Sequence, residues 1–282
     1  MTESLRTATH HSYARAVSLV RRGPRTILFA PRIHMGVGNY FYLWLWADAR
    51  QARGLPDRVL RSDTMNTWLQ AFPTMEPLVI ARRDVRFRDL RALGTYQGFG
   101  ENFSAPELEG FLQRRVLPST GLLGLDPYEV DPRRVVVNVR RGDYYSNPEF
   151  RRRFGFNIVG YLREAFRLAA WDDISAIHVV SDGLDWCRTN LAWLDEVAPL
   201  SFATEGDGAM ANLREVASAR RLVLTNSTFS YWAGYISNVL HGDNHAEVVA
   251  PLFHDRTICD GLAYQLDPRW TAVRCLPNGW DE

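Results

Sequence analysis

VVVNVRRGDYYSNP, residues 135–148, carries the clearest structural pattern in the chain. Its valine run is nearly continuous, which is typical of a strand that is covered on both faces in a parallel sheet. The run leads directly into two arginines, a glycine, an aspartate and two tyrosines. In open parallel sheets, ligands bind where loops and helix N-termini meet at the carboxyl ends of the strands. The stretch therefore predicts a parallel sheet with a ligand site at its end.

Helical and strand patterns alternate on the C-terminal side of this stretch. The segments expected to form strands are 133–140, 175–182 and 221–227, and those expected to form helices are 157–171, 185–194, 210–220 and 228–240. Such alternation predicts a right-handed, doubly wound parallel sheet over residues 133–240.

The N-terminal part has fewer periodic segments. Residues 25–31 read as a strand that a proline stops, and residues 36–54 as a glycine turn that enters a helix with an aromatic face. Residues 57–130 show scattered proline and glycine without a clear period. We expect a mobile arm over residues 1–24, an N-terminal half over residues 25–130 and a C-terminal half over residues 131–282.

Composition excludes several classes of protein. The 282 residues carry a net charge of +1, whereas a general nucleic-acid binder has a marked basic excess. The three cysteines have no CxxC spacing, so a disulfide framework and a zinc ribbon are not indicated, and we expect a cytoplasmic protein. The apolar run at residues 40–47 is much shorter than the about 18–20 residues that cross a membrane. No integral membrane segment is expected, and peripheral membrane association stays open.

Three strand ends in the C-terminal half are polar. Arg140 and Arg141 follow the first strand, Ser181 and Asp182 follow the second, and residues 225–230, TNSTFS, follow the third. The last two lead into helices, whose first N–H groups attract anions, and arginine forks suit phosphate. Pattern alone leaves two interpretations open: a diphosphate site, or a charged turn with Ser181 and Ser227 as ordinary helix caps.

These same residues carry a family resemblance. NVRRGDYYSNP resembles the H-x-R-R-x-D-Y segment of the α-1,2-fucosyltransferases, glycosyltransferase family eleven, and its SNP is similar to many bacterial members. SDGLDW is similar to the family's S-D-D-x-x-W block, and NSTFSYWAGYI to its N-S-T-F-S-W-W block. GVGNYFYLW near the N-terminus and the late DPRW also match family segments. Because the blocks keep the family's order, the resemblance is specific.

The resemblance implies a GT-B architecture, in which two Rossmann-like halves face each other across a cleft. It implies an inverting, metal-independent enzyme that transfers fucose from GDP-fucose to a glycan hydroxyl, expected to be the 2-OH of galactose, with no cofactor. Arg140 would bind the diphosphate, while Arg141 and Asp143 orient it and Asn39 reaches the cleft from the other half. The implied donor-binding residues are Asn138, Arg140, Arg141, Ser181, Asp182, Asn226, Ser227, Thr228, Phe229 and Ser230. The implied acceptor-side residues are Gly36, Gly38, Asn39 and Tyr40.

The chain departs from the family pattern at several polar positions. Asn138 stands where the motif has histidine, and Gly183 replaces the second aspartate of the second block. Further departures are Tyr40 for glutamine, Asn212 for an acidic residue and Phe154 for histidine. We therefore keep an alternative, in which the chain is a catalytically degenerate protein of the same fold that binds a sugar nucleotide or a glycan.

Adjacent residues of a strand point to opposite faces, so Arg140 and Arg141 are not expected to meet one phosphate group together. The resemblance assigns the phosphate to Arg140, which leaves Arg141 to support the loop through Asp143 or a nearby carbonyl group. One other motif, HGDNH at residues 241–245, has histidines at metal-like spacing. Its glycine and asparagine favour a loop, so no metal site is expected.

Overall fold

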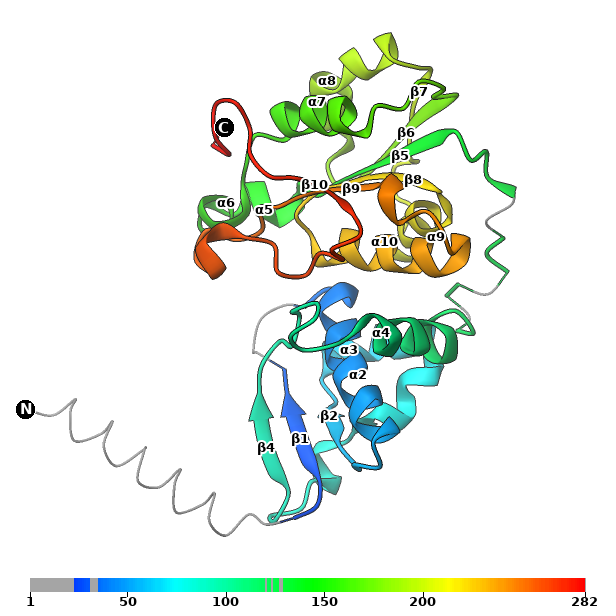
Figure 1. The fold of residues 1–282 in the computed structure, drawn as a ribbon. Helices are drawn as coiled ribbons and strands as arrows, with labels where there is room; N and C mark the ends of the chain where they lie inside the picture. Colours follow the sequence, from blue (N-terminus) through cyan, green and yellow to red (C-terminus); the bar gives the residue numbers. More distant parts are fainter. Residues whose placement is uncertain (1–22, 31–34, 120, 123, 127–128, 282) are drawn as a thin grey trace, which may run out of the picture. The chain divides into compact units, whose positions relative to one another are not determined.

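The computed structural model describes residues 23–30, 35–119, 121–122, 124–126 and 129–281 (Figure 1). By its contacts, the chain divides into two compact units, residues 1–96 and residues 97–282. The expected mobile arm lies almost wholly outside the described residues. Each unit contains a parallel sheet, so the predicted α/β class with two halves of this type is confirmed.

The first unit is built on a four-stranded sheet of order β3-β2-β1-β4. Its strands are β1 (Thr26–Phe29), β2 (Arg58–Leu60), β3 (Val79–Ile80) and β4 (Leu90–Leu93). Helix α2 (Val37–Ala52) follows β1 as predicted, and its aromatic face is buried. Helix α3 (Asp63–Ala71) and strands β2 to β4 lie in the stretch for which the sequence showed no clear period. These strands have four residues or fewer, which is too short for a recognisable alternation.

The second unit is built on a six-stranded sheet of order β10-β9-β8-β5-β6-β7. The predicted strands are β5 (Arg134–Val139), β6 (Ala176–Ser181) and β8 (Arg221–Leu224). Strands β7 (Leu200–Phe202), β9 (Val248–Pro251) and β10 (Thr271–Val273) complete the sheet and were not predicted. From β5 the chain adds strands on one side, then returns to add β8 to β10 on the other. The switch point between β5 and β8 is where such sheets bind ligands.

Helices cover both faces of this sheet (Figure 1). Helices α7 (Ile158–Ala169) and α8 (Leu184–Asn190) cover one face, and α9 (Ala209–Ser218) and α10 (Thr228–His241) the other. Two short helices, α5 (Gly142–Ser146) and α6 (Pro148–Phe154), follow β5 directly. Val135, Val137 and Val139 pack into the core beneath α7, whereas Asn138 reaches α10. The valine run is therefore buried on both faces, as predicted.

The boundary between the compact units falls earlier than the expected boundary at residue 130. Helix α4 (Ala105–Phe111) and the π-helical turn Leu112–Val116 after it belong to the second unit. The reason is packing: the Phe111 ring lies 5.8 Å from the Trp232 ring on α10. The backbone N–H of Phe99 also donates to the carbonyl of Tyr264, at 3.0 Å.

The DPRW segment, residues 267–270, packs against α10 and holds it in place. Trp270 Nε1 donates to Asn238 Oδ1 on α10 at 2.6 Å, and the Trp270 ring lies against Gly234. A Cβ atom at Gly234 would come within 2.9 Å of both this ring and Leu224, so glycine lets the helix approach the sheet closely. The orientation of α10 sets the position of its N-terminus, which forms part of the site described next.

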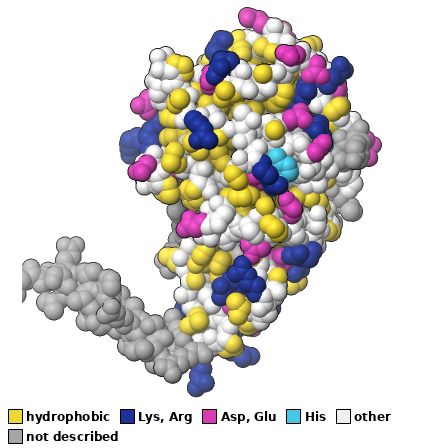
Figure 2. Space-filling model, viewed as in Figure 1, with side chains coloured by type: hydrophobic (Ala, Val, Ile, Leu, Met, Phe, Trp, Pro, Cys, Tyr) yellow, Lys and Arg dark blue, Asp and Glu magenta, His cyan; other side chains and the backbone are white. Residues whose placement is uncertain are grey.

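No helix among the described residues has both the length and the apolar composition that a bilayer crossing requires. Figure 2 shows positive and negative side chains interspersed over the visible face, with no continuous field of one sign. This surface agrees with the near-zero net charge of the chain.

Candidate active site at the carboxyl end of β5

The side chains of Arg140 and Arg141 diverge just beyond β5. Arg140 lines a pocket together with Asn212 of α9 and Phe229 of α10. The guanidinium group of Arg141 instead lies over the rings of Tyr145, at 3.5 Å, and of Trp186 on α8, at 4.1 Å. Because α8 and α10 cover opposite faces of the sheet, the arginines continue the alternation of the strand beyond its end. Their predicted separation is confirmed.

Two carboxylates hold Arg140. Its Nη1 lies 2.6 Å from Asp182 Oδ2, and its Nη2 lies 2.5 Å from Asp143 Oδ1. Burial alone would lower the pKa of Arg140, but the negative charges of Asp182 and Asp143 outweigh burial and raise it. Asp143 therefore pairs with Arg140, and not with Arg141 as the sequence suggested. Arg141 is supported by aromatic rings, because its side chain points to the face that carries Tyr145 and Trp186.

Asp182 is held more firmly than Asp143. Asp182 Oδ1 accepts the backbone N–H of Arg141 at 2.6 Å, while its other oxygen pairs with Arg140. A Cβ atom at Gly142 would lie 2.3 Å from Asp182 Oδ2, so the glycine of RRGD makes room for this carboxylate. The Asp143 side chain is 50% exposed, compared with 31% for Asp182. Breaking the Arg140–Asp143 pair therefore costs less free energy than breaking the Arg140–Asp182 pair.

Asn138 is a structural link in place of the family histidine. Its Nδ2 donates to the carbonyl of Val180 in β6 at 3.1 Å, and its Oδ1 accepts from Ser230 Oγ on α10 at 2.6 Å. Thr225 completes the connection: its Oγ1 donates to the Asn138 carbonyl and accepts the backbone N–H of Arg140. Asn138 and Ser230 therefore fix the strand ends that present Arg140.

The predicted serine and asparagine residues have different roles. Ser227 is the N-cap of α10, where its Oγ accepts the N–H of Phe229 at 3.3 Å. Ser181 is not a helix cap, because α8 starts later with Gly183 as its N-cap; its Oγ accepts the N–H of Gly183. Asn226 is buried, and its Nδ2 donates to the carbonyls of Phe154 and His254. Asn226 therefore ties together the ends of neighbouring segments.

Two adjoining pockets surround these groups. The Arg140 pocket and a larger one of about 440 Å³ share Ser181, Asp182, Ala209 and Asn212. The N-termini of both α9 and α10 border the Arg140 pocket, so two helix dipoles add to its positive potential. This arrangement, an arginine beside two helix starts, fits an anion such as a diphosphate.

Asn212 is a site residue whose role the sequence did not identify. Its Oδ1 is buried and accepts no hydrogen bond from any described residue. Since buried acceptors are almost always satisfied, this oxygen is suited to a donor group on a ligand that enters from the shared wall of the two pockets. The only signal in the sequence was its alignment with an acidic family position.

Gly183 also has a physical explanation. A Cβ atom there would lie 2.6 Å from the Cβ atom of Arg141. The aspartate found in the family would therefore displace the arginine side chain from its position between Tyr145 and Trp186. Glycine at position 183 therefore leaves room for Arg141 to pack against these two rings.

The residues implied for the acceptor side lie in the first unit. Gly36 is the N-cap of α2, and Gly38 and Asn39 lie in its first turn. Tyr40 is buried, and its hydroxyl group bonds Ser62 Oγ at 3.2 Å and Thr64 Oγ1 at 2.5 Å. Tyr40 thus contributes to the core of its own unit. A cleft between the two halves, and the approach of Asn39 to the donor site, stay predictions.

Among the described residues, no group of three or more His, Cys, Asp or Glu side chains is arranged to hold a metal ion. The histidines of HGDNH do not share one helix, because His241 ends α10 and His245 starts a short 3₁₀ turn. The expectation of a loop between them is confirmed.

A buried histidine, His254, lies beside the stacked rings of Phe154 and Tyr144. Phe154 stacks on Tyr144 at 4.4 Å and meets the His254 ring edge-on at 6.0 Å. Burial lowers the pKa of His254 from 6.5 to about 4; the charge of Asp255 opposes this shift and that of Arg153 adds to it. The imidazole is therefore neutral in the folded protein near pH 7.

We expect this histidine to make stability depend on pH. Between about pH 6.5 and pH 4 the unfolded chain binds a proton that the folded chain does not, so the free energy of unfolding falls as pH decreases. The loss from this group reaches about 3 kcal/mol. Urea unfolding of wild type and His254→Gln at pH 7, 5.5 and 4.5 measures it. The variant should lose less stability than wild type over this range, and equal losses would exclude His254 as the cause.

Comparisons with known proteins identify the family. Residues 107–255 match the model of Glycosyl transferase family 11. A galactoside alpha-(1,2)-fucosyltransferase 1 of Lagothrix lagotricha is 31% identical over 108 residues, which cover 36% of this chain and 28% of the relative. An alpha-1,2-colitosyltransferase of Escherichia coli is 27% identical over 114 residues, covering 37% of this chain and 36% of the relative. The matched segment therefore spans about a third or less of the length of these relatives.

Two solved structures in complex with GDP were also found as similar. A mutant of Arabidopsis thaliana FUT1 in complex with GDP has a TM-score of 0.41 and 13% identity, with 96% of this chain and 77% of that chain covered. POFUT1 in complex with GDP has a TM-score of 0.38 and 12% identity, with 78% of this chain and 97% of that chain covered. The family match, in contrast, spans more than half of the 282 residues and includes β5, β6, β8 and α10, which form the site. The resemblance seen in the sequence is confirmed, and the chain belongs to glycosyl transferase family 11.

Proposed function

We propose that this protein transfers fucose, or a closely related deoxy sugar, from a GDP-linked donor to a hydroxyl group of a glycan acceptor, with the 2-OH of galactose as the expected position. The observation that carries the proposal is the place of Arg140. It lies in a pocket at the carboxyl end of β5, bordered by the N-termini of α9 and α10. The names of the relatives suggest fucose or colitose as the sugar.

The chemistry requires a stabilised leaving group. When the bond between sugar and diphosphate breaks, negative charge develops on the β-phosphate while the sugar becomes oxocarbenium-like. The guanidinium fork of Arg140 and the helix N–H groups stabilise that charge without a metal ion. The acceptor hydroxyl attacks the anomeric carbon from the side opposite the diphosphate, which inverts its configuration. The glycosidic bond forms as the bond to the β-phosphate breaks, GDP leaves, and the hydroxyl proton passes to water or to the released diphosphate. In this proposal Asn39 and the start of α2 lie on the acceptor side.

The carboxylates at Arg140 set a condition for donor binding. A diphosphate adds negative charge beside Asp143 and Asp182. One of the two ion pairs of Arg140 must therefore break so that the phosphate can take its place. Asp143 is the more exposed and less anchored of the two, and we infer that it moves away while Asp182 keeps Arg140 oriented. This exchange keeps Arg140 paired in both states.

The larger adjoining pocket is suited to the guanine base. Besides the residues it shares with the Arg140 pocket, it contains Trp186 and a loop with Glu205 and Asp207. Glu205 is paired with Arg188, whereas Asp207 has no ion-pair partner among the described residues. A carboxylate can accept from both N1–H and the 2-amino group of guanine, a pair of donors that adenine and uracil lack. We infer that Asp207 reads the base and that Asn212 accepts a hydrogen bond from the nucleoside.

The alternative of a degenerate binding protein has one observation in its favour. Both side-chain polar atoms of Asn138 are committed to structural hydrogen bonds, so this position supplies no proton-transfer group. Arg140 remains in the pocket, however, and it is the group on which leaving-group stabilisation depends. For location we propose the cytoplasm, in keeping with free Cys187, Cys259 and Cys275.

Release of GDP tests the proposal directly. The protein is incubated with GDP-fucose or GDP-colitose, with and without galactosides, and free GDP is measured in the presence and absence of EDTA. We expect acceptor-dependent release that EDTA leaves unchanged. GDP at a hundredfold excess over Kd should stabilise the fold by about 2.7 kcal/mol. Tight GDP binding without turnover would favour the degenerate protein, absence of both would refute the proposal, and rescue by a divalent metal after EDTA would refute its metal independence.

Replacement of the two arginines separates their roles. We expect Arg140→Ala to lower turnover by about two to three orders of magnitude, the usual cost of losing one preorganised donor to the transition state. Arg140→Lys keeps the charge but loses the fork, so it should also be impaired. Arg141→Ala should affect turnover less and lower the free energy of unfolding by about 1–2 kcal/mol, because it loses contacts with Tyr145 and Trp186. Wild-type GDP affinity in Arg140→Ala would show that the phosphate binds elsewhere.

Base selectivity tests the role of Asp207. Asp207→Ala should weaken GDP binding by about tenfold or more, as expected for a lost hydrogen bond to a charged group, and leave the weaker ADP binding unchanged. Asp172→Ala, an exposed aspartate outside both pockets, is the matched control. Calorimetry with GDP and ADP measures both affinities. An equal loss for the two nucleotides, or none for GDP, would exclude base recognition by Asp207.

A further inference from the structure

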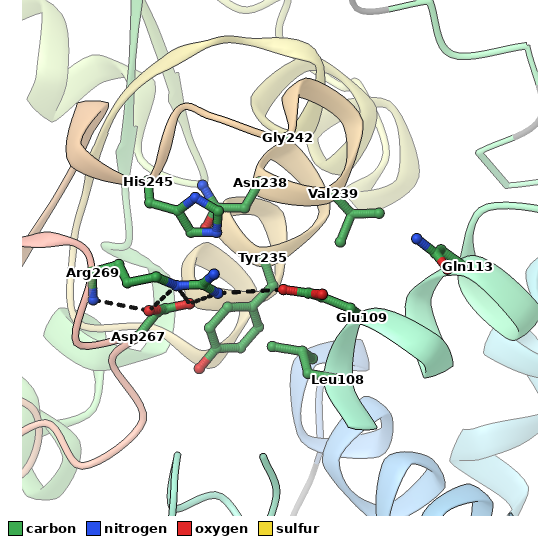
Figure 3. A pocket seen from close by; sticks show the side chains of 10 residues that line it. All are labelled: Leu108, Glu109, Gln113, Tyr235, Asn238, Val239, Gly242, His245, Asp267 and Arg269. Carbon is green, nitrogen blue, oxygen red and sulfur yellow. Dashed lines mark hydrogen bonds and ion pairs between the residues drawn. The ribbon is translucent and has the colours of Figure 1, made fainter. Parts of the chain in front are cut away.

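A separate pocket lies at the other end of α10 (Figure 3). It has a volume of about 180 Å³ and is formed by α4, the C-terminal half of α10 and the segment that contains Asp267 and Arg269. The first residue of α10 that lines this pocket, Tyr235, lies seven residues after the helix start at Thr228, which is about 10 Å at about 1.5 Å per residue. All of its lining residues belong to the second unit.

An ion-pair framework forms one wall of the pocket. Asp267 is buried, and its Oδ2 accepts from Arg269 Nη2 at 2.7 Å while its Oδ1 accepts from Arg269 Nε at 3.0 Å. Arg269 Nη2 also lies 3.5 Å from Glu109 Oε1 on α4, as Figure 3 shows. Two carboxylates thus face one guanidinium group. The same charge ratio holds at Arg140, but there helix N-termini add positive potential, whereas this pocket lies at the C-terminal end of α10, where the helix dipole is negative and disfavours an anion.

Two further polar side chains are available to a ligand. The His245 ring and the Gln113 amide line the pocket and make no hydrogen bond to another described residue. Burial lowers the pKa of His245, and the charge of Arg269 lowers it further, so the ring is neutral near pH 7. A neutral imidazole supplies one donor and one acceptor, and an amide supplies both kinds as well.

The remaining wall is largely apolar. Leu108, Tyr235 and Val239 contribute hydrocarbon surface. Asn238 lies beside them, but its side chain is already committed: Nδ2 donates to Asn244 Oδ1 at 2.8 Å, and Oδ1 accepts from Trp270 Nε1. These bonds fix the shape of the pocket in the absence of a ligand.

We propose that this pocket binds a single pyranose unit of a neutral carbohydrate. A pyranose presents C–H groups on its faces and hydroxyl groups around its rim, and each hydroxyl both donates and accepts. The pocket offers a matching set: an apolar wall, a carboxylate at Glu109, and mixed donors and acceptors at His245 and Gln113. An anion would meet the excess carboxylate, and an apolar ligand would leave these polar groups without partners.

Such a site adds a function to the one proposed above. Because its lining residues and those of the Arg140 pocket do not overlap and lie toward opposite ends of α10, it does not take the sugar that reacts. It would hold another sugar unit of the same glycan or of a neighbouring one, and so raise the effective concentration of the acceptor. The inference does not depend on the identity of the donor.

Binding of simple sugars to the full chain tests the inference. Methyl glycosides of galactose, glucose, mannose, fucose and N-acetylglucosamine are titrated with GDP at saturation, and binding is followed by saturation-transfer NMR and calorimetry. We expect at least one glycoside to bind with a Kd in the millimolar range, about −4 kcal/mol, as is usual for a small site.

Variants then locate the binding. Val239→Phe fills the pocket and Gln113→Ala removes one of its free polar groups, so each should weaken glycoside binding at least tenfold while GDP affinity stays at the wild-type value. Gln70→Ala, an exposed glutamine in the first unit, is the matched control and should change neither. Gln113 is itself exposed, which protects that variant from misfolding.

Other results would overturn the inference. It fails if no glycoside binds or if both pocket variants keep wild-type glycoside affinity. It also fails if inorganic phosphate binds and the pocket variants weaken phosphate binding instead of glycoside binding. GDP affinity is measured separately, so a protein that binds glycosides here but not GDP would refute the proposed transferase and leave this site standing.

Discussion

Strand β5 sends consecutive side chains to opposite faces of its sheet, and the arrangement of the site depends on this alternation. Asn138 points to the face covered by α10, and Arg140 follows it into the pocket beside α9 and α10. Arg141 points to the other face, where its guanidinium group lies against Trp186 of α8. One strand thus presents a ligand-binding arginine and a structural arginine at adjacent positions. A shift of one residue in the register of β5 would exchange them.

The departures from the family pattern are linked to one another in space. Asn138 bridges β6 and α10 through its amide, a link that uses both of its polar side-chain atoms. Gly183 leaves space for the stem of Arg141, and Gly142 leaves space for Asp182. The substituted positions Asn138 and Gly183, together with Gly142 at a variable position of the motif, form a consistent local packing around Arg140. They are therefore better understood as a different way to support the same arginine than as a collapse of the site.

Electrostatics determine what the site can accept. Arg140 is paired with two carboxylates, so its charge is balanced before a ligand enters. A diphosphate must gain more from the arginine fork and the two helix starts than it loses by approaching Asp143 and Asp182. The pocket at the other end of α10 also has two carboxylates and one guanidinium group, but it lies at the negative end of the helix dipole and its free groups are neutral. Helix α10 therefore lies between a site suited to an anion and a site suited to a neutral ligand.

The parallel sheet around β5, the long helices and the family could be predicted from the sequence alone, because valine runs, helical periods and motif order are local properties. The sequence also identified Arg140 and predicted that Arg141 would point elsewhere. Three features emerge only from the folded chain: Asp143 pairs with Arg140, Arg141 rests on aromatic rings, and α4 packs with the C-terminal half. Strands as short as β2 and β7 leave no readable period. Pockets such as those at Asn212 and His245 join residues far apart in the chain, so they exist only once the chain has folded.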